Sequence, residues 1–445
     1  MNNRKLILSA ISSSLLLACQ FGWSQSATSV QVKARVALAQ QTGKPLPLVP
    51  ANAVPAGHYR PHIMVLSAMA SQLPSLNAQF KPNLTLPSFC NKPRTGNGFQ
   101  FCPNAMQAAY GVPFKKTPAG TISYDGTGMT IGIVDAYHYA NASSDLDHFN
   151  AEMGLPACTA ASGCFKQLDQ NGGTNYCGAN ANWELETMLD LEWAHSIAPG
   201  AKIVLVEGCS NSFADLGAAV TTAVSLTDVV SNSYGAGEFS GENTYDSTYN
   251  VNKPILFSSG DNGTPTSYPC ASPYATCVGG TSLRVNPTTF QRTLETGWSG
   301  SGGGCSSQEA QPGYQSANGV NGCGVFRATP DVAADADPNT GAIVYDSGNG
   351  GHYLVGGTSL ASPVTAALYA DVMQARHPFG QMNPSLYTAG CHGVADCTGT
   401  GKINAYYYYD VLTGNNGLAA GPGYDQVTGM GVSNAAHLGG LFGLN

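Results

Sequence analysis

Apolar runs of strand length alternate with runs of helical periodicity through most of the chain after about residue 101. The strand-like runs are MTIGIVDA, AKIVLVEG, TDVVSNSYG and KPILFSSGD, at residues 129–136, 201–208, 227–235 and 253–261. Helical patterns fill residues 184–198 and 213–226 between them. Strands that alternate with helices are typical of a parallel sheet covered by helices on both faces. The pattern therefore predicts an α/β fold with a mainly parallel central sheet flanked by helices.

Composition and hydrophobic periodicity divide the chain into three segments. Residues 1–25 begin with the basic stretch MNNRK and continue into the apolar run LILSAISSSLLLA, which is typical of an export signal peptide. Residues 26–100 are rich in Ala, Pro and Gln and lack sustained periodicity, so we expect a leader or short prosegment rather than a second core. Residues 101–445 carry the strand and helix alternation and are predicted to form the main domain.

The end of the export signal admits two interpretations. The stretch Leu16-Leu17-Ala18-Cys19 fits a lipoprotein cleavage box, which would leave a lipid anchor at Cys19, whereas the small residues of 24–27 suit ordinary signal peptidase. Both predict a protein outside the cytoplasm, either secreted, periplasmic or attached to the outer membrane. No other run reaches the ~20 apolar residues of a spanning helix, so we expect no transmembrane helix.

Charge is sparse in this chain. Charged residues make up 10% of it, and the formal net charge is −8. The chain therefore lacks the excess of Lys and Arg that binds nucleic acid or an anionic membrane, and we expect no nucleic-acid partner. Proteins usually unfold in acid because carboxylates that form ion pairs become protonated. This chain has few carboxylates, so its fold should tolerate low pH. We also expect a monomer.

Thirteen cysteines become twelve when Cys19 is assigned to the signal, and an even number in an exported chain predicts disulfides. A metal site is disfavoured because no two cysteines have CxxC spacing. The pairs we expect from proximity in the sequence are Cys158 with Cys164, Cys270 with Cys277, Cys305 with Cys323 and Cys391 with Cys397, which leaves Cys90 with Cys102 and Cys177 with Cys209.

Ser359 is the candidate nucleophile, since it lies in the small-residue turn GGTSLASP between a strand-like run and a helix-like run. A serine hydroxyl needs a neighbouring base to remove its proton. The nine histidines offer no His-Gly-Thr turn, and His195 lies within a long helical pattern, where a structural role is commoner. Histidine is therefore a poor candidate for the base.

Two carboxylates are better candidates. Glu186 and Asp190 are four residues apart on the expected helix, so both side chains project from one face. Neighbouring carboxylates repel each other when both are ionised, so one pKa rises and the pair can share a proton. A solvated acidic face is the common alternative, but the flanking residues are too apolar for a surface stripe. We therefore expect a buried pair beside the serine.

An ordered set of motifs adds a resemblance to these observations. The chain carries ETMLD, HSIAPGAKIVLVE, SNSYG, SSGDNG, WSGSGGGCS, PDVAADADPNTG and GGTSLASP in that order. This set resembles the sedolisin family of serine-carboxyl peptidases from about residue 101 to the end. The resemblance implies a subtilisin-like three-layer fold and a Ser-Glu-Asp triad of Ser359, Glu186 and Asp190. Glu186 would be the general base, Asp190 would orient it, and the substrate would be a protein or peptide.

The resemblance also implies an aspartic acid that stabilises the oxyanion, and Asp261 in SSGDNG matches it. An ionised carboxylate has no hydrogen to donate, so Asp261 can serve only while protonated. The expected function is thus peptide hydrolysis at acidic pH. The backbone N–H of Ser359 would be the second donor. Asp135 follows a strand where subtilisins have their triad aspartate, but with no histidine to orient we interpret it as structural.

Two further sites follow from the resemblance. One structural calcium ion would bind near the C-terminus, and oxygen ligands from carboxylates and backbone suit such a hard cation. The matching residues are Asp410, Val411, Gly421, Gly423 and Asp425. The substrate backbone would pair in an extended conformation with Ser233 to Gly235. The family usually carries a long prodomain, and the segment here is short, so activation could differ.

Two alternatives stay open at this point. One is an α/β-hydrolase esterase, because residues 357–361 are one residue short of Gly-x-Ser-x-Gly and Asp371, His377 and His392 follow the serine. The other is a surface protein that keeps the peptidase fold without turnover.

Overall fold

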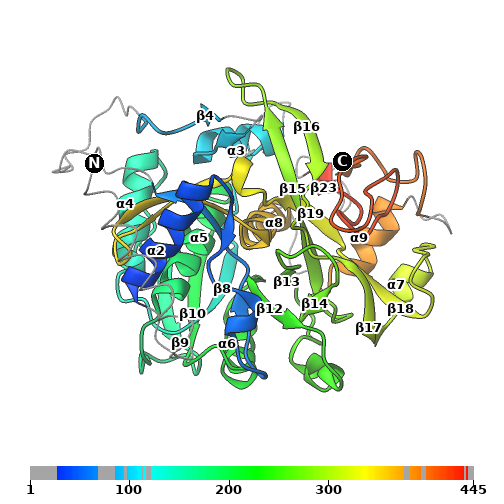
Figure 1. The fold of residues 1–445 in the computed structure, drawn as a ribbon, viewed down its shortest axis with the longest axis horizontal. Coiled ribbons are helices and arrows are strands. Elements are labelled where there is room, and N and C mark those ends of the chain that lie inside the picture. The colour runs from blue at the N-terminus through cyan, green and yellow to red at the C-terminus, as the bar shows by residue number, and fades with distance from the viewer. Residues whose placement is uncertain are drawn as a thin grey trace, which may run out of the picture.

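The strand-like runs of the sequence form one large central sheet (Figure 1). The computed structural model describes residues 28–68, 86–94, 98–112, 114–116, 122–374, 380–391, 397–434 and 437–438. The export signal, Cys19, His377 and His392 lie outside these residues. Within them the central sheet has the order β22 (Tyr408–Tyr409), β23 (Val432–Ser433), β19 (Val332–Asp335), β15 (Thr276–Val285), β13 (Ile255–Ser258), β11 (Val229–Asn232), β8 (Thr130–Ala136), β10 (Lys202–Gly208) and β9 (Phe165–Asp169), and β16 (Arg292–Gly297) pairs with β15.

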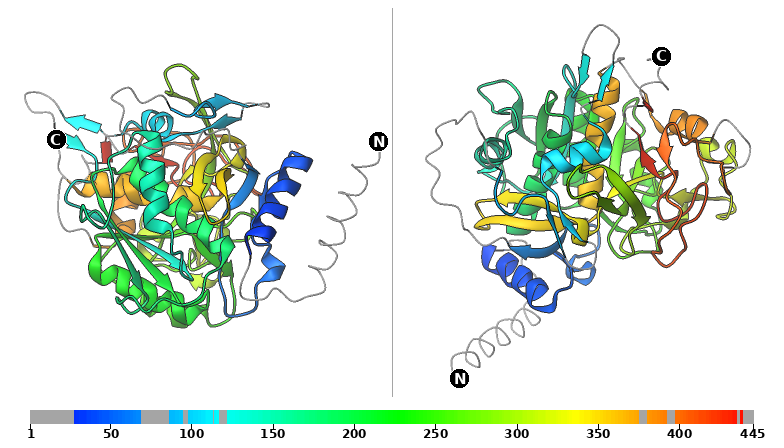
Figure 2. Two further views of the ribbon diagram at one scale, coloured as in Figure 1. Left: turned by 90° about the vertical axis from the view of Figure 1, so that its left-hand side faces the viewer. Right: turned by 90° about the horizontal axis from the view of Figure 1, so that it is seen from above.

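The sheet is parallel from β23 to β9, with antiparallel pairs only where β16 and β22 join it. Successive side chains of a strand point to opposite faces. On β8, Ile131 and Ile133 accordingly join the core under α5 (Ala181–Ile197) and α8 (Thr358–Met373), while Val134 joins the core under α6 (Phe213–Leu226). Helices thus cover both faces, and the predicted three-layer α/β fold is confirmed (Figures 1 and 2).

The two helices on one face are buried almost completely. Every residue of α8 is buried, and Glu184 is the one residue of α5 that is not. The reason is that α5 packs between β8, α8, α4 (Ala142–Met153) and the hairpin strand β20 (Ala342–Asp346). Polar side chains on α5 and α8 are therefore held away from water.

Residues 28–68 pack on the main domain. Helix α2 (Ser29–Thr42) covers β3 (Met64–Ala68), and β3 lies between β1 (Leu46–Pro47) and β21 (Gly351–Gly356) in an antiparallel sheet that ends at β20 (Figure 1). Val32, Val36 and Ile63 are buried in the same hydrophobic core as the main domain. This segment therefore adds to the existing core and forms no second one.

The remaining elements are short and lie around these layers. They are η1 (Ala51–Ala53), β2 (Arg60–Pro61), β4 (Lys92–Pro93), β5 (Phe99–Gln100), α3 (Pro103–Tyr110), β6 (Phe114–Lys116), β7 (Ile122–Tyr124), β12 (Tyr234–Gly237), η3 (Glu242–Thr248), β14 (Ser267–Tyr268), β17 (Gly304–Ala310), α7 (Gly313–Ser316), β18 (Phe326–Thr329), η4 (Pro338–Thr340) and α9 (Asn383–Gly390).

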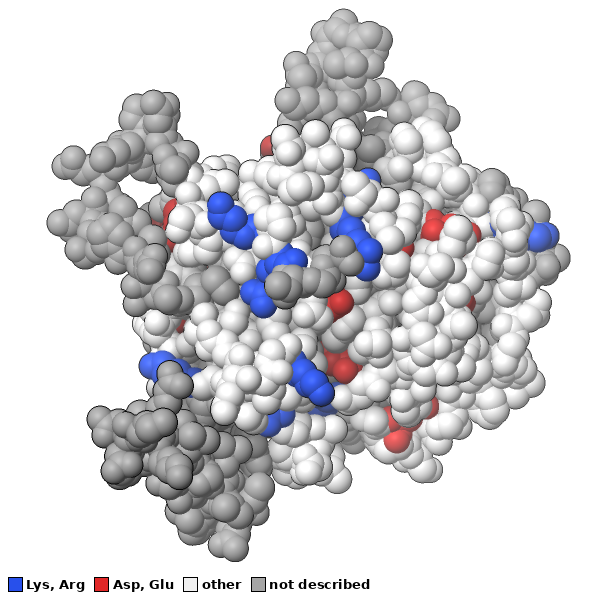
Figure 3. Space-filling view, turned by 45° about the horizontal axis from the view of Figure 1, so that its top comes forward, with Lys and Arg blue, Asp and Glu red and all other residues white. Residues whose placement is uncertain are grey.

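All six expected disulfides are confirmed. They join Cys90 to Cys102, Cys158 to Cys164, Cys177 to Cys209, Cys270 to Cys277, Cys305 to Cys323 and Cys391 to Cys397. This number of disulfides is typical of proteins that fold in an oxidising compartment. In the described part of the chain no helix is long and apolar enough to cross a membrane. Most of the face drawn in Figure 3 carries neither Lys or Arg nor Asp or Glu, in keeping with the sparse charge.

Candidate active site

Ser359 lies in the first turn of α8, directly after strand β21. Gly357 precedes the helix with a φ of +102°, a conformation that favours glycine. A Cβ atom at Gly357 would lie 2.2 Å from the backbone oxygen of His62, so any side chain here would collide with the chain that crosses the turn. The Ser359 hydroxyl is buried and donates to the backbone oxygen of Ser233, at 3.2 Å.

Glu186 and Asp190 lie one turn apart on α5, which packs directly against α8. Both side chains are fully buried, so the solvated-face alternative is wrong. The Ser233 hydroxyl donates to Oδ1 of Asp190 at 2.8 Å and also lies 3.3 Å from the backbone oxygen of Ser359. Neither carboxyl oxygen of Glu186 makes a hydrogen bond of normal geometry to a described residue. The nucleophile and the carboxylate pair are thus joined through Ser233.

The surroundings of this pair favour its protonated forms. Burial raises the pKa of Glu186 well above its ordinary value, the charges of Asp190 and Asp135 raise it further, and the Ser359 hydroxyl acts in the opposite direction. Burial followed by the charge of Asp135 raises the pKa of Asp190 well above its ordinary value, against the bond from Ser233. Such a pair loses its two protons in two steps, and the pKa of each step describes the pair rather than one of its residues.

Asp135 is the carboxylate whose place beside the pair the sequence analysis missed. It lies near the end of β8, is fully buried, and has a pKa raised to about 8 by burial and then by the charge of Glu207. Because its charge acts on both Glu186 and Asp190, it belongs to the same buried acidic cluster. Its position near the end of the strand IGIV was the available signal, but a strand-end aspartate often only caps a helix.

Asp261 follows β13 and faces the turn that carries Ser359. Its Oδ1 accepts the backbone N–H of Thr358 at 2.8 Å and the Thr358 hydroxyl at 2.9 Å. Its Oδ2 is buried and has no hydrogen-bond partner among the described residues. Burial raises the pKa of Asp261 to about 7, against the bonds from Thr358 and the charge of Arg60. A protonated carboxyl group at this place has an O–H free to donate.

The chain's own residues 57–62 lie beside Ser359 and pair with the strands around it. Strand β2 pairs with β12 in antiparallel register, so that Arg60 lies opposite Gly235. The His62 N–H donates to the backbone oxygen of Ser233 at 3.0 Å. The backbone N–H of Ser359 donates to the backbone oxygen of His62 at 3.1 Å. Ser233 and Gly235, predicted to bind a substrate backbone, therefore lie along an extended peptide.

Asp261 shares the surroundings of that peptide carbonyl. A Cβ atom at Gly357 would lie 2.2 Å from the His62 oxygen and 2.7 Å from Oδ2 of Asp261, so both oxygens flank the same point. The peptide carbonyl that accepts the Ser359 N–H and the unpartnered oxygen of Asp261 therefore lie on the same side of the Gly357 turn.

Comparison with known proteins bears on this arrangement. A family model described as "Subtilase family" matches residues 165–387. Kumamolisin from Bacillus sp. (strain MN-32) is 30% identical over 425 residues, covering 85% of this chain and 72% of that protein. The chain belongs to the sedolisin family. Sedolisin from Pseudomonas sp. (strain 101) is 34% identical over 188 residues, covering 39% of this chain and 29% of that protein.

A solved structure agrees with this assignment. The complex of Pseudomonas sedolisin, a serine-carboxyl proteinase, with two molecules of pseudo-iodotyrostatin superposes with a TM-score of 0.63 at 26% identity. The match covers 76% of this chain and 96% of that one. This sedolisin-family chain is therefore a serine-type peptidase with the subtilisin-like fold, and its substrates are peptides.

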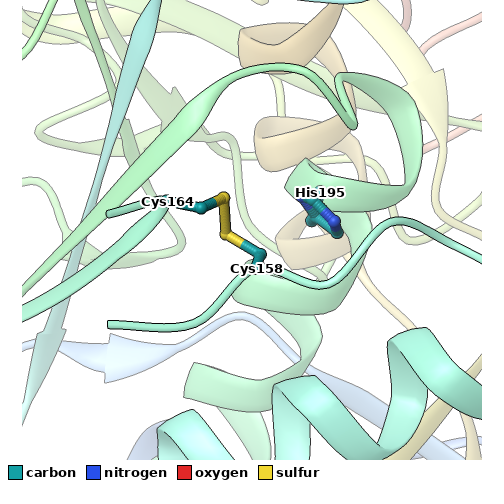
Figure 4. A group of neighbouring side chains, drawn as sticks. All are labelled: Cys158, Cys164 and His195. Carbon is teal, nitrogen blue, oxygen red and sulfur yellow. A yellow bond between two sulfur atoms is a disulfide. The ribbon is translucent and has the colours of Figure 1, made fainter. Parts of the chain in front are cut away.

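His195 plays a structural part in this sedolisin-family chain. Its Nε2 lies 2.9 Å from the backbone oxygen of Pro156, and burial lowers its pKa. Figure 4 shows the ring beside the disulfide between Cys158 and Cys164, whose sulfur atoms are bonded to each other. Although these three side chains have the spacing of a metal site, the disulfide removes two thiolate ligands. His195 is thus neither the base nor a metal ligand.

The region matched to a calcium site brings its predicted residues together. The Gly423 N–H donates to Oδ2 of Asp410 at 3.1 Å, and the Gly421 N–H donates to Oδ2 of Asp425 at 3.0 Å. Oδ1 of Asp410 is buried and has no partner among the described residues. Val411, which follows Asp410, is fully buried. A buried, unpartnered carboxylate oxygen with a second carboxylate on the same loops fits the donor set of a calcium ion.

Proposed function

We propose that this chain is an exported serine-carboxyl endopeptidase that acts at acidic pH through a triad of Ser359, Glu186 and Asp190. The observation that carries the proposal is the peptide carbonyl of His62, which accepts the Ser359 N–H at 3.1 Å beside the buried acids. A hydrolase needs this placement of a scissile carbonyl over its nucleophile.

Acylation begins when the Ser359 Oγ attacks the carbonyl carbon. The hydroxyl proton passes to the carboxylate of Glu186, which is the general base. The C–N bond then breaks, and the departing amine takes that proton back from Glu186. This leaves an ester between the peptide acyl group and Ser359. Water, with its proton removed by Glu186, attacks the ester and restores the free serine.

Asp190 positions the base and holds a proton. When the pair carries a single negative charge, the two carboxyl groups share one proton, and Glu186 acts as the base in the form in which that proton is on Asp190. The hydrogen bond from Ser233 fixes the Asp190 carboxyl group. Asp135 adds repulsion, which disfavours a second negative charge in this cluster. A singly charged pair is therefore the active form.

Asp261 makes the site dependent on acid. The oxyanion of the tetrahedral intermediate would accept the Ser359 N–H and the O–H of protonated Asp261. An ionised Asp261 has no hydrogen to donate and repels the oxyanion. Since its pKa is about 7, Asp261 carries its proton below that pH and loses it above. Activity should therefore be present in acid and decline as the pH rises through about 7.

A structural calcium ion would be held by the carboxylates of Asp410 and Asp425 and by backbone oxygens near Val411, Gly421 and Gly423. When bound, the ion would supply positive charge that offsets two partly buried carboxylates. The catalytic groups lie on α5, α8 and the loop after β13, so the ion would stabilise the C-terminal loops rather than take part in the reaction.

The two alternatives make different demands on the site. An esterase of the α/β-hydrolase type needs Asp371 or another acid near the serine, but Asp371 lies on α8 twelve residues from Ser359, about 18 Å along the helix. A surface protein without turnover has no use for a buried carboxylate pair. We therefore prefer the peptidase, acting as a monomer. After export it would either be secreted or be held at a membrane by a lipid anchor at Cys19.

Labelling of Ser359 tests the proposed function. The protein is incubated with a peptide aldehyde at about pH 4, and its inhibition of peptide cleavage and the modified residue are measured. We expect inhibition and a hemiacetal at Ser359, and no binding to the Ser359→Ala variant. Cleavage of simple acyl esters at neutral pH with none of peptides in acid would instead favour the esterase.

A further inference from the structure

The chain's own residues 57–62 lie between two segments of backbone in the way a substrate strand would. On one side, the Tyr59 N–H donates to the backbone oxygen of Asn211 at 2.8 Å and the Phe213 N–H donates to that of Gly57 at 3.0 Å. On the other side, β12 pairs with β2. With the His62 carbonyl at Ser359, Tyr59 is the fourth residue before the bond that faces the nucleophile.

Tyr59 is held by an aromatic pocket. Its side chain is 1% exposed, and its ring stacks on that of Phe213 with centroids 4.2 Å apart. The ring of Tyr234 lies 5.2 Å away, and the hydroxyl group lies 3.3 Å from that of Tyr249. The Asn211 side chain also donates to the backbone oxygen of Tyr59 at 2.6 Å. The pocket therefore fixes both the ring and the backbone of this residue.

The pocket continues into open space. A cavity of about 400 Å³ adjoins it, and its walls are residues 51–58 with Arg60 on one side and Phe213, Phe239 and Tyr245 with residues 235–237 on the other. The rings of Phe213 and Phe239 stack at 5.2 Å, so aromatic surface continues beyond Tyr59. Phe213 is therefore shared between the pocket that holds Tyr59 and this cavity.

The side chain at the nucleophile is held by a polar contact. His62 is also 1% exposed, and its Nδ1 lies 2.7 Å from the Ser258 hydroxyl; among the described residues no aromatic ring pairs with the imidazole. Burial, with the charge of Arg60 next, lowers the pKa of His62 well below its ordinary value, so an imidazolium in acid is disfavoured here. The aromatic pocket has no group that gains charge in acid, so it can recognise its residue equally well throughout the acid range.

We propose that the pocket formed by Phe213, Tyr234 and Tyr249 is a specificity pocket of this peptidase, and that it selects peptides with an aromatic residue four positions before the cleaved bond. The proposal rests on the proposed function, since it assigns a substrate class to the same site. Burying one aromatic ring stabilises a complex enough to change kcat/KM by about tenfold or more.

The test uses peptides with the sequence of residues 57–66, GHYRPHIMVL, and variants in which Tyr59→Ala or Tyr59→Phe is made in the peptide alone. The full chain is incubated in acid, and kcat/KM is measured for each peptide with the cleaved bond identified by mass spectrometry. We expect cleavage after the histidine that corresponds to His62. The Tyr59→Ala peptide should be cleaved at least about tenfold more slowly, and the Tyr59→Phe peptide at nearly the original rate.

A protein variant gives a second measurement. Phe213→Ala removes the ring that stacks on tyrosine, so it should reduce the ratio of kcat/KM between the tyrosine and alanine peptides. Equal rates for these two peptides, or an unchanged ratio in Phe213→Ala, would overturn the inference. If other peptides of a mixed library are cleaved and these are not, the inference is also wrong while the proposed function stands. If nothing is cleaved at any pH, both are wrong.

Discussion

Replacing Asp261 with asparagine tests the acid requirement in a single step. In the native site, Oδ1 of Asp261 accepts two hydrogen bonds from Thr358, and Oδ2 has no partner. The asparagine carbonyl can accept the same two bonds, and its amide group places N–H donors where the carboxylic O–H would be. Asp261→Asn should therefore fold normally and keep an oxyanion donor that does not titrate.

The magnitude follows from the raised pKa of Asp261, which is about 7. At about pH 5 nearly every molecule carries the proton, whereas at one unit above the pKa about one molecule in ten does. The ratio of kcat/KM between Asp261→Asn and the wild type should thus rise about tenfold between about pH 5 and about pH 8. In Asp261→Ala the donor is lost at every pH, so activity in acid should fall by about 10² to 10³.

The assay is kcat/KM on one fluorogenic peptide across this pH range. Both proteins keep Glu186 and Asp190, and the charge of Asp261 is the smallest of the causes that raise the pKa of Glu186, so the ratio of variant to wild type largely cancels the titration of this pair. Asp371→Asn is the matched control, because Asp371 is a fully buried carboxyl on α8 whose oxygens have no partner among the described residues. Its ratio should stay constant with pH. A constant ratio for Asp261→Asn as well would refute the assigned role of Asp261.

Three other predictions follow from the same geometry. Glu186→Gln should lower kcat/KM in acid by about 10² to 10⁴. Glu192→Gln changes another buried acid of α5 and should leave kcat/KM nearly unchanged. Equal losses for the two variants on one peptide would contradict the role of Glu186 as the base. The free energy of unfolding should fall as the pH rises from about 4 to about 8. A carboxyl group whose pKa is raised in the folded state contributes its full stabilisation at a pH below its unfolded pKa, and it loses this stabilisation as the pH rises through its folded pKa. For Asp261 the raised pKa of about 7 corresponds to about 4 kcal/mol, and thermal melts of Ser359→Ala that show constant or rising stability would oppose this. Chelation of calcium should lower the melting temperature of the wild type and leave that of Asp410→Asn unchanged, and the same melting temperature with and without chelator would argue against the ion.

The parts of the fold with strong local patterns could be predicted from the sequence. Parallel strands such as β8 (Thr130–Ala136) carry continuous apolar runs, and α6 has the bounds that its pattern indicates, Phe213–Leu226. The pairing of near neighbours among the cysteines was also sufficient for the disulfides. These features depend on a few consecutive residues, so they are visible without knowledge of the tertiary contacts.

The pairing of residues 57–62 beside Ser359 could not be predicted in this way. Strand β2 has two residues, Arg60 and Pro61, and its partner β12 lies more than 170 residues later in the chain. Two residues give no periodicity, and Pro61 disfavours a strand assignment. The position of Asp135 beside Glu186 could not be predicted for the same reason. The two residues come from different elements that meet only because α5 packs on β8.

The most direct test of the acid mechanism is the pH profile of kcat/KM for the wild-type protein on a mixed peptide library. The shared proton of Glu186 and Asp190 and the protonated Asp261 together predict cleavage in acid that declines about tenfold per unit above about pH 7. Vigorous cleavage confined to alkaline buffer would contradict it.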